Sequence, residues 1–68
     1  MLIDTTIIKI MKSRKKISHI DLQNEVAKIL KGKFLPENSA IKLRIEYLID
    51  KEYIERSRED KSLYIYKS

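Results

Sequence analysis

The 68-residue chain has no cysteine and no tryptophan, and it has only one glycine and one proline. Without cysteine it can form neither a disulfide nor a thiolate metal site, so its stability must come from burying the 43% of residues that are hydrophobic. A chain this short buries only about 60% of the surface that its unfolded form exposes. We therefore expect one domain with a small core, spanning residues 1–68.

Long hydrophobic runs are also missing. The longest uninterrupted apolar stretch is Leu63–Tyr66, far below the ~18 residues that a membrane-spanning helix needs. The first ten residues contain Asp4 and Lys9 and no small-residue cleavage site, so they do not resemble a signal peptide. Without a targeting signal in this segment, we expect an intracellular protein of the cytoplasm and nucleus.

The residue patterns of enzymes are absent too. No paired carboxylates, nucleophile with a base, or glycine-rich phosphate loop is visible, and 68 residues leave little room for a cleft. His19 is the only histidine, and with no cysteine beside it a transition-metal site is disfavoured. We predict a domain that is not an enzyme and carries no metal or cofactor.

Apolar residues at helical spacing predict three helices. The first ends near Arg14, the second begins after the N-cap Ser18 and closes at a left-handed Gly32, and the third begins after an N-cap at Asn38 or Ser39 and ends near Lys51. Their expected inward faces are Ile3, Ile7, Ile10 and Met11; Leu22, Val26, Ile29 and Leu30; and Ile41, Ile45, Leu48 and Ile49.

Beyond the third helix the period changes to two. Tyr53–Arg56 and Leu63–Tyr66 are β-prone stretches on either side of the charged turn Arg58–Lys61, and they predict a hairpin. With a short extended piece near Ile17, the chain has the element order of a winged helix. The predicted class is α+β, with a three-helix core, a short strand and a C-terminal β-hairpin wing.

The net charge of +5 and the pI near 9.6 make nucleic acid the first partner to consider. In a winged helix that binds DNA, the last helix enters the major groove. Here the outward face of that helix holds Leu43, Glu46, Tyr47 and Asp50, and the two carboxylates would repel phosphates. A winged-helix nucleic-acid-binding domain that uses the basic end of the first helix remains the alternative function.

The exposed side chains divide into two groups of interest. Lys9, Lys12 and Arg14–Lys16 place five cations within eight residues at the end of the first helix. The helical wheel turns Lys12 fully outward, with Ile8 one turn before it on an exposed flank. Leu43 and Tyr47, one turn apart on the third helix, are a candidate interaction patch.

Several stretches resemble the C-terminal winged-helix domain of the cullins. Ile7–Lys15 is close to the family's neddylation motif I-V-R-I-M-K-x-R-K, and Ile41–Arg56 is similar to its I-K-x-R-I-E-x-L-I-x-x-x-Y-[IL]-E-R segment. Lys33–Pro36 resembles R-F-x-P, and Tyr64–Tyr66 resembles the closing Y-x-Y. The spacing is preserved across almost the whole chain.

This resemblance implies that the chain is the C-terminal part of a cullin-like scaffold in a RING-type ubiquitin ligase complex. It implies that Lys12 accepts a Nedd-type ubiquitin-like modifier by an isopeptide bond, which activates the ligase for ubiquitin-dependent protein catabolism. The implied partners are a RING-box subunit, the modifier and its conjugating enzyme, a neddylation co-ligase and the signalosome deneddylase. Residues expected to help the modifying enzymes dock are Ile8, Lys9, Arg14, Lys15 and Lys16.

Overall fold

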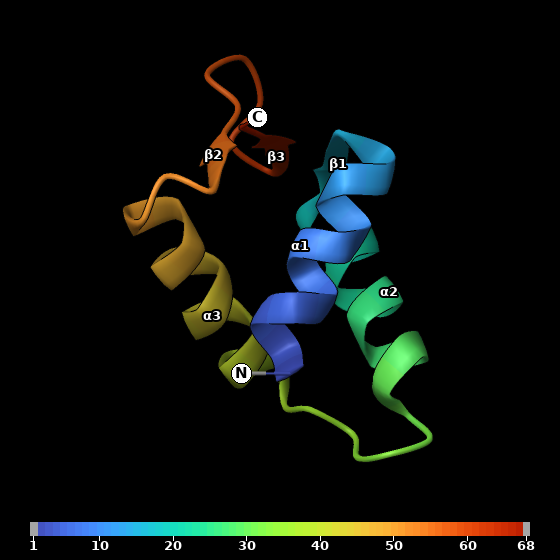
Figure 1. Cartoon of the computed structure of the whole chain (residues 1–68). Helices are drawn as coiled ribbons and strands as arrows, with labels where there is room; N and C mark the ends of the chain where they lie inside the picture. The colour runs from blue at the N-terminus through green and yellow to red at the C-terminus, as the bar shows by residue number, and fades with distance from the viewer. Residues whose placement is uncertain (1, 68) are drawn as a thin grey trace.

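The computed structural model describes residues 2–67, within which the chain forms three helices and three short strands (Figure 1). In chain order these are α1 Leu2–Arg14, β1 Lys16–Ser18, α2 His19–Leu30, α3 Asn38–Asp50, β2 Ile54–Arg56 and β3 Leu63–Tyr66. This is the order predicted from the apolar spacing. The α+β winged-helix prediction is confirmed.

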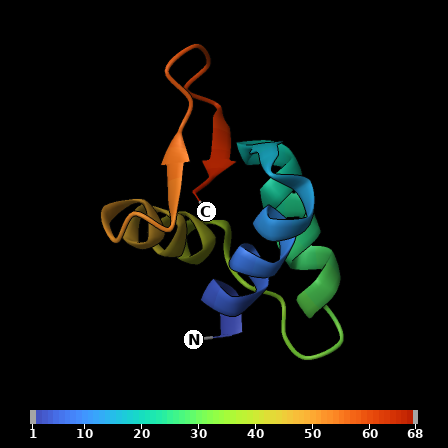
Figure 2. The ribbon, with the colours of Figure 1, turned by 45° about the horizontal axis from the view of Figure 1, so that its top comes forward.

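The three strands form one small antiparallel sheet with the order β1-β3-β2. β3 is central: Ile17 of β1 lies opposite Tyr64, and Glu55 of β2 lies opposite Ile65. β2, β3 and the loop between them project from the helices as the wing (Figure 2). The pairing of β1 with β3 ties the segment that follows α1 to the far end of the chain.

The core lies where the inward faces of the three helices meet the sheet. Ile7 and Met11 of α1 are fully buried, because α1 packs against both α2 and α3 (Figure 1). Ile3 and Ile10 of α1 are buried as well, and the other elements contribute further buried hydrophobic residues, which include Leu22, Val26, Leu30, Ile41, Ile45, Leu48, Ile54 and Tyr64. Among residues 2–67 no helix combines the length and apolarity needed to cross a membrane.

The start of α2 is as predicted, whereas its end is not. The Ser18 hydroxyl accepts a hydrogen bond of 3.2 Å from the Asp21 amide, which satisfies one free donor of the first turn. Gly32 does not have a positive φ, because the chain continues in right-handed turns in which the amides of Lys33 and Phe34 both donate to Leu30. The left-handed prediction for Gly32 is therefore wrong.

The left-handed positions instead follow the other two helices. Lys15 after α1 has a φ of 68°, and Glu52 after α3 has a φ of 63°. A residue in this conformation lets the amides after a helix bond back to its last carbonyls. Residues other than glycine adopt the left-handed conformation at a cost in free energy. The contacts made around Lys15 and Glu52 must therefore offset that strain.

The start of α3 also differs from the prediction. Glu37 is the N-cap residue, with extended backbone angles, and Asn38 is already helical. The long side chain of Glu37 does not form a capping hydrogen bond with a backbone amide of the helix. Instead, its carboxylate accepts a hydrogen bond of 3.5 Å from the Ser39 hydroxyl. The expected cap at Asn38 or Ser39 is therefore wrong, because the extended residue after Pro36 starts the helix earlier than the capping preferences indicate.

The burial of two apolar residues differs from the prediction: Ile29 is more exposed than expected, and Ile8 is more buried. Ile29 is 52% exposed, because Leu22, Val26 and Leu30 centre the inward stripe of α2 and leave Ile29 at its edge. Ile8 is half-buried and packs against the core, rather than lying on an exposed flank. Ile49 is partly buried and packs against the core on the predicted face of α3.

Candidate functional site

Lys12 lies in the last turn of α1 with its side chain exposed. The two residues before it, Ile10 and Met11, are 6% and 0% exposed, and their burial fixes the rotation of the helix. Within residues 2–67, Lys12 has no ion-pair or hydrogen-bond partner. Its ε-amine is therefore presented to solvent by a helix that is itself held by the core, as the helical wheel predicts.

The chain that follows Lys12 is anchored to the sheet by Lys15. The Lys15 amide donates to Met11 across 2.7 Å, and the Lys15 carbonyl accepts from the amide of Tyr66 across 2.8 Å. The Lys15 Nζ also lies 5.2 Å from the centre of the Tyr66 ring, within the range of a cation–π interaction. These contacts hold the end of α1, and with it the backbone that carries Lys12, against β3.

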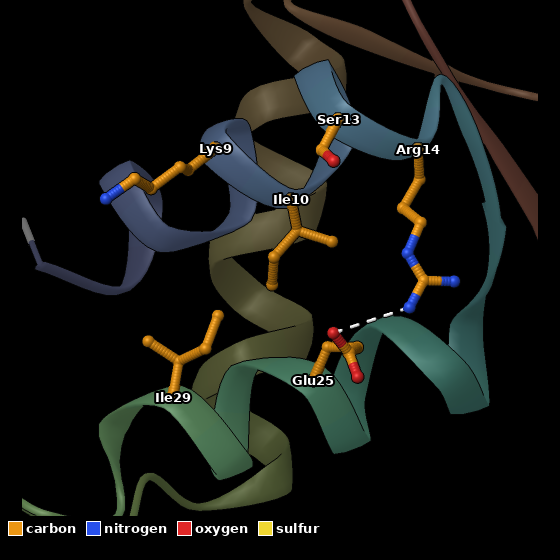
Figure 3. Close-up of a pocket in the computed structure, with 6 residues that line it drawn as sticks. All are labelled: Lys9, Ile10, Ser13, Arg14, Glu25 and Ile29. Atoms are coloured by element: carbon orange, nitrogen blue, oxygen red, sulfur yellow. Dashed lines mark ion pairs between the residues drawn. The ribbon is translucent and has the colours of Figure 1, made fainter.

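A shallow hollow of about 210 Å³ lies between α1 and α2, beside the residues that flank Lys12 (Figure 3). Arg14 closes one end of it through an ion pair of 3.5 Å with Glu25 of α2. Ile29 points from α2 toward α1 at the other end. The complete lining is Lys9, Ile10, Ser13, Arg14, Glu25 and Ile29, so cations and exposed apolar atoms lie together next to the candidate acceptor.

Comparison with known proteins shows the family to which the chain belongs. The family model for the cullin protein neddylation domain matches residues 1–60. The chain belongs to this family. Cullin-3 of Dictyostelium discoideum is 45% identical over 64 residues, which cover 94% of this chain and 8% of that protein. The chain thus corresponds to a small part of this relative's length.

A solved structure supports the same assignment. It is described as "A Dual E3 Mechanism for Rub1 Ligation to Cdc53: Dcn1(P)-Cdc53(WHB)". The match has a TM-score of 0.93 and 28% sequence identity, and covers 98% of this chain and 77% of that one. Together these matches favour a cullin neddylation domain over the alternative of a nucleic-acid-binding winged helix.

The predicted docking residues of this cullin domain differ in whether their side chains already have a partner within the domain. Lys9 and Lys16 are exposed and have no ion-pair partner among the described residues. Arg14 is paired with Glu25, and Lys15 lies over Tyr66. Because Ile8 packs against the core, it offers a partner only part of its side chain.

The candidate patch on α3 is exposed but is not purely apolar. Leu43 is 68% exposed and Tyr47 is 43% exposed. The guanidinium of Arg44 lies 4.3 Å from the centre of the Tyr47 ring, and the Lys51 Nζ lies 5.7 Å from it. The aromatic face of this patch is therefore partly covered by cations of its own helix.

Arg44 also joins α3 to α1. Its Nε and Nη2 each donate to a different carboxylate oxygen of Asp4, both across 2.6 Å. The hydrogen bonds from Arg44 hold the pKa of the Asp4 carboxyl below its ordinary value, and the same bonds raise the pKa of Arg44. This two-bond pair links the start of α1, the helix that carries Lys12, to α3.

His19 has a structural partner in the cullin domain. Its Nδ1 lies 2.8 Å from the hydroxyl of Tyr64, and the two rings meet edge to face. Within residues 2–67 there is no cluster of three or more His, Cys, Asp or Glu side chains that could hold a metal ion. The histidine thus links the start of α2 to β3.

Some residues that shape the acceptor region were not identifiable from local sequence patterns. Glu25 and Ile29 border the hollow beside Lys12, and Tyr66 contacts Lys15. Glu25 and Ile29 lie on α2, more than ten residues after the part of α1 that they face, and Tyr66 lies on β3, far along the chain from Lys15. Helical periodicity therefore carries no signal for these contacts. Ser13, the residue after Lys12, also lines the hollow, and the opposite wall belongs to α2.

Proposed function

We propose that Lys12 is the residue of this cullin domain that accepts a Nedd-type ubiquitin-like modifier. In the reaction, the neutral ε-amine attacks the thioester carbonyl that joins the modifier to the cysteine of its conjugating enzyme. The new C–N bond is the isopeptide, the C–S bond breaks, and the cysteine leaves as a thiol after taking up the equivalent of the proton that the amine loses. The domain is the substrate of this step.

One observation carries the proposal: in a chain that belongs to the cullin neddylation family, Lys12 stands at the lysine of the motif-like stretch Ile7–Lys15, and its side chain is exposed with no ion-pair partner among residues 2–67. An acceptor amine must reach a thioester held on another protein, which a lysine packed against the core could not do. Because no carboxylate of the described chain is paired with Lys12, removal of its proton falls to the docking enzyme.

The surroundings of Lys12 support docking of the modifying enzymes there. Lys9 and Lys16 are free to meet acidic side chains, Arg14 can exchange Glu25 for a partner carboxylate, and Lys15 borders the same surface. The similar solved structure concerns Rub1 ligation to Cdc53 and contains Dcn1. On this basis we propose that a co-ligase and a conjugating enzyme contact this end of α1.

The wider role extends the same proposal. The chain corresponds to 8% of the length of Cullin-3, so we propose that it serves as the C-terminal domain of a longer cullin scaffold in a RING-type ubiquitin ligase of the cytoplasm and nucleus. Its modification would activate that ligase, with a RING-box subunit and a signalosome deneddylase as further partners. Membership of the cullin family is consistent with a domain that is not itself an enzyme.

The test is a reconstituted neddylation reaction on the protein that contains this domain, followed by mass spectrometry of the modified lysine. Lys12→Arg should abolish mono-modification, because arginine keeps the charge but has no nucleophilic amine at neutral pH. The matched controls Lys31→Arg and Lys33→Arg change exposed lysines of the turn after α2, outside the proposed docking surface, and should be modified at the wild-type rate. Modification of Lys12→Arg at the wild-type rate would refute the assignment.

A further inference from the structure

A second hollow lies away from the acceptor, between α3, the start of α2 and the wing. Its volume is about 320 Å³, and no residue of its lining belongs to the hollow beside Lys12. The side chains around it are mainly polar: His19, Lys42, Glu46, Arg56, Lys61, Ser62 and Tyr64. The proposed modification reaction uses none of them.

The charges in this hollow do not cancel. Glu46 is its only acidic side chain, and Arg56 pairs with it across 2.7 Å. That leaves Lys42 and Lys61, which are exposed and have no ion-pair partner among residues 2–67. The hollow therefore has two unpaired lysines, one on α3 and one on the wing, against the nearby carboxylate of Asp60, which accepts from the amide and hydroxyl of the lining residue Ser62.

The histidine in the hollow is held in a fixed position. Tyr64 is 3% exposed, and its burial raises the pKa of its phenol, which keeps the hydroxyl proton in place. That hydroxyl and Nδ1 of His19 lie 2.8 Å apart and form one hydrogen bond, which leaves the other ring nitrogen, Nε2, for a further partner. The backbone amide of His19 also donates to Ser62 across 2.7 Å, which fixes the ring relative to the wing.

We infer that this hollow binds a single phosphate group. Two lysine ammonium groups from different elements are the kind of donor that a tetrahedral oxyanion takes, and the ring nitrogen of His19 that does not bond Tyr64 can add a further hydrogen bond. His19 is also the first residue of α2, so the positive end of that helix lies beside the hollow. The Ser62 hydroxyl is not one of these donors, because it donates to the Asp60 carboxylate across 2.6 Å. The three groups come from α2, α3 and the wing, and only the folded chain brings them together.

The surrounding charges favour one phosphate over a nucleic-acid backbone. Glu46 and Asp50 follow along the exposed side of α3, and Glu59 and Asp60 lie on the wing. An extended row of phosphates would have to pass all of these carboxylates, whereas a single group has only to reach the two lysines beside Glu46, which is paired with Arg56, and Asp60, which is bonded to Ser62. A phosphorylated side chain and free phosphate share this chemistry, and the experiment separates them.

The experiment is a titration of the ¹⁵N-labelled chain with inorganic phosphate, against sodium chloride at equal ionic strength. We expect saturable shifts of the amides of Lys42, Lys61 and Ser62 and of the His19 imidazole. The double variant Lys42→Gln, Lys61→Gln should bind about tenfold more weakly or worse, because it loses both charged donors. The matched control Lys31→Gln, Lys33→Gln removes two exposed lysines from the turn after α2 and should bind like the wild type.

Two further arms complete the test. A phosphoserine peptide is compared with the same peptide lacking the phosphate: tighter binding than inorganic phosphate identifies a phosphorylated partner, and equal binding identifies free phosphate as sufficient. Both results require loss in the Lys42, Lys61 double variant, whose thermal unfolding midpoint shows that it is folded. Shifts that never saturate, equal binding by the double variant, or tighter binding of a short DNA duplex would overturn the inference.

Discussion

Replacing Ile7 by valine tests whether the buried face of α1 is what holds Lys12 outward. Ile7 is 0% exposed in the core that α1 shares with α2 and α3, so the change removes one fully buried methylene. The loss from such a change is about 0.5–1.5 kcal/mol. A domain of 68 residues has a total stability of about 3–10 kcal/mol, so this is a measurable fraction of the whole.

The expected shift in the unfolding midpoint follows from the size of the domain. With an unfolding entropy of about 2.1 cal/mol/K for each of the 68 residues, 1 kcal/mol corresponds to about 7 °C. Ile7→Val should therefore lower the midpoint by about 4–10 °C in a thermal melt followed by circular dichroism.

Ile20→Val is the matched control. Ile20 is also helical, but it is 62% exposed, so the same substitution removes little buried surface. Because both variants exchange one β-branched residue for another in a helix, the change in helix propensity cancels in the comparison. We expect a shift of less than about 4 °C for Ile20→Val. A drop for Ile7→Val no larger than the drop for Ile20→Val would refute the assignment of the core.

Two other substitutions test features that link or end the helices. Asp4→Asn should lower the midpoint by a few degrees at pH 7, because Arg44 loses its carboxylate partner. Since the folded-state pKa of Asp4 lies below 3.8, this stabilisation is complete above that pH and is lost as the pH falls through the folded-state pKa. The midpoints of the variant and the wild type should therefore converge in melts at lower pH, and a gap that does not change with pH would contradict the pairing. Gly32→Ala should raise the midpoint by about 3–7 °C, since Gly32 lacks a positive φ and a Cβ there would meet no atom within 4 Å; a lower midpoint would show that the turn needs glycine.

The elements of this domain were predictable because its apolar residues repeat so regularly. Ile7 and Met11 on α1, or Ile41 and Ile45 on α3, are one turn apart, and in each pair both side chains are buried. Such spacing reports the helix and its inward face together. The outward position of Lys12 followed from the same wheel, which is why the exposure of the candidate acceptor was predictable before any coordinates.

The errors lie where tertiary contacts decide local structure. Glycine is the usual left-handed residue after a helix, yet here Lys15 takes that conformation, and its carbonyl and ammonium both contact Tyr66, which lies 51 residues later. Gly32, with no such contact to satisfy, stays right-handed. The pair formed by Asp4 and Arg44 is equally invisible to a local pattern, because its members lie 40 residues apart.

The net charge of +5 acquires a different meaning once each cation is placed. Arg44 and Arg56 are paired with acids, so they add little to the field at the surface. Among the cations without an ion-pair partner in the described residues, Lys9, Lys12, Lys15 and Lys16 lie at the end of α1, and Lys42 and Lys61 border the second hollow. The others are Lys28, Lys31, Lys33, Lys51 and Arg58. Since acidic residues of α3 and the wing lie among these cations, the surface is not one continuous track for a polyanion. The separation of the second hollow from the end of α1 would let a phosphate group occupy the hollow while Lys12 stays open to modification.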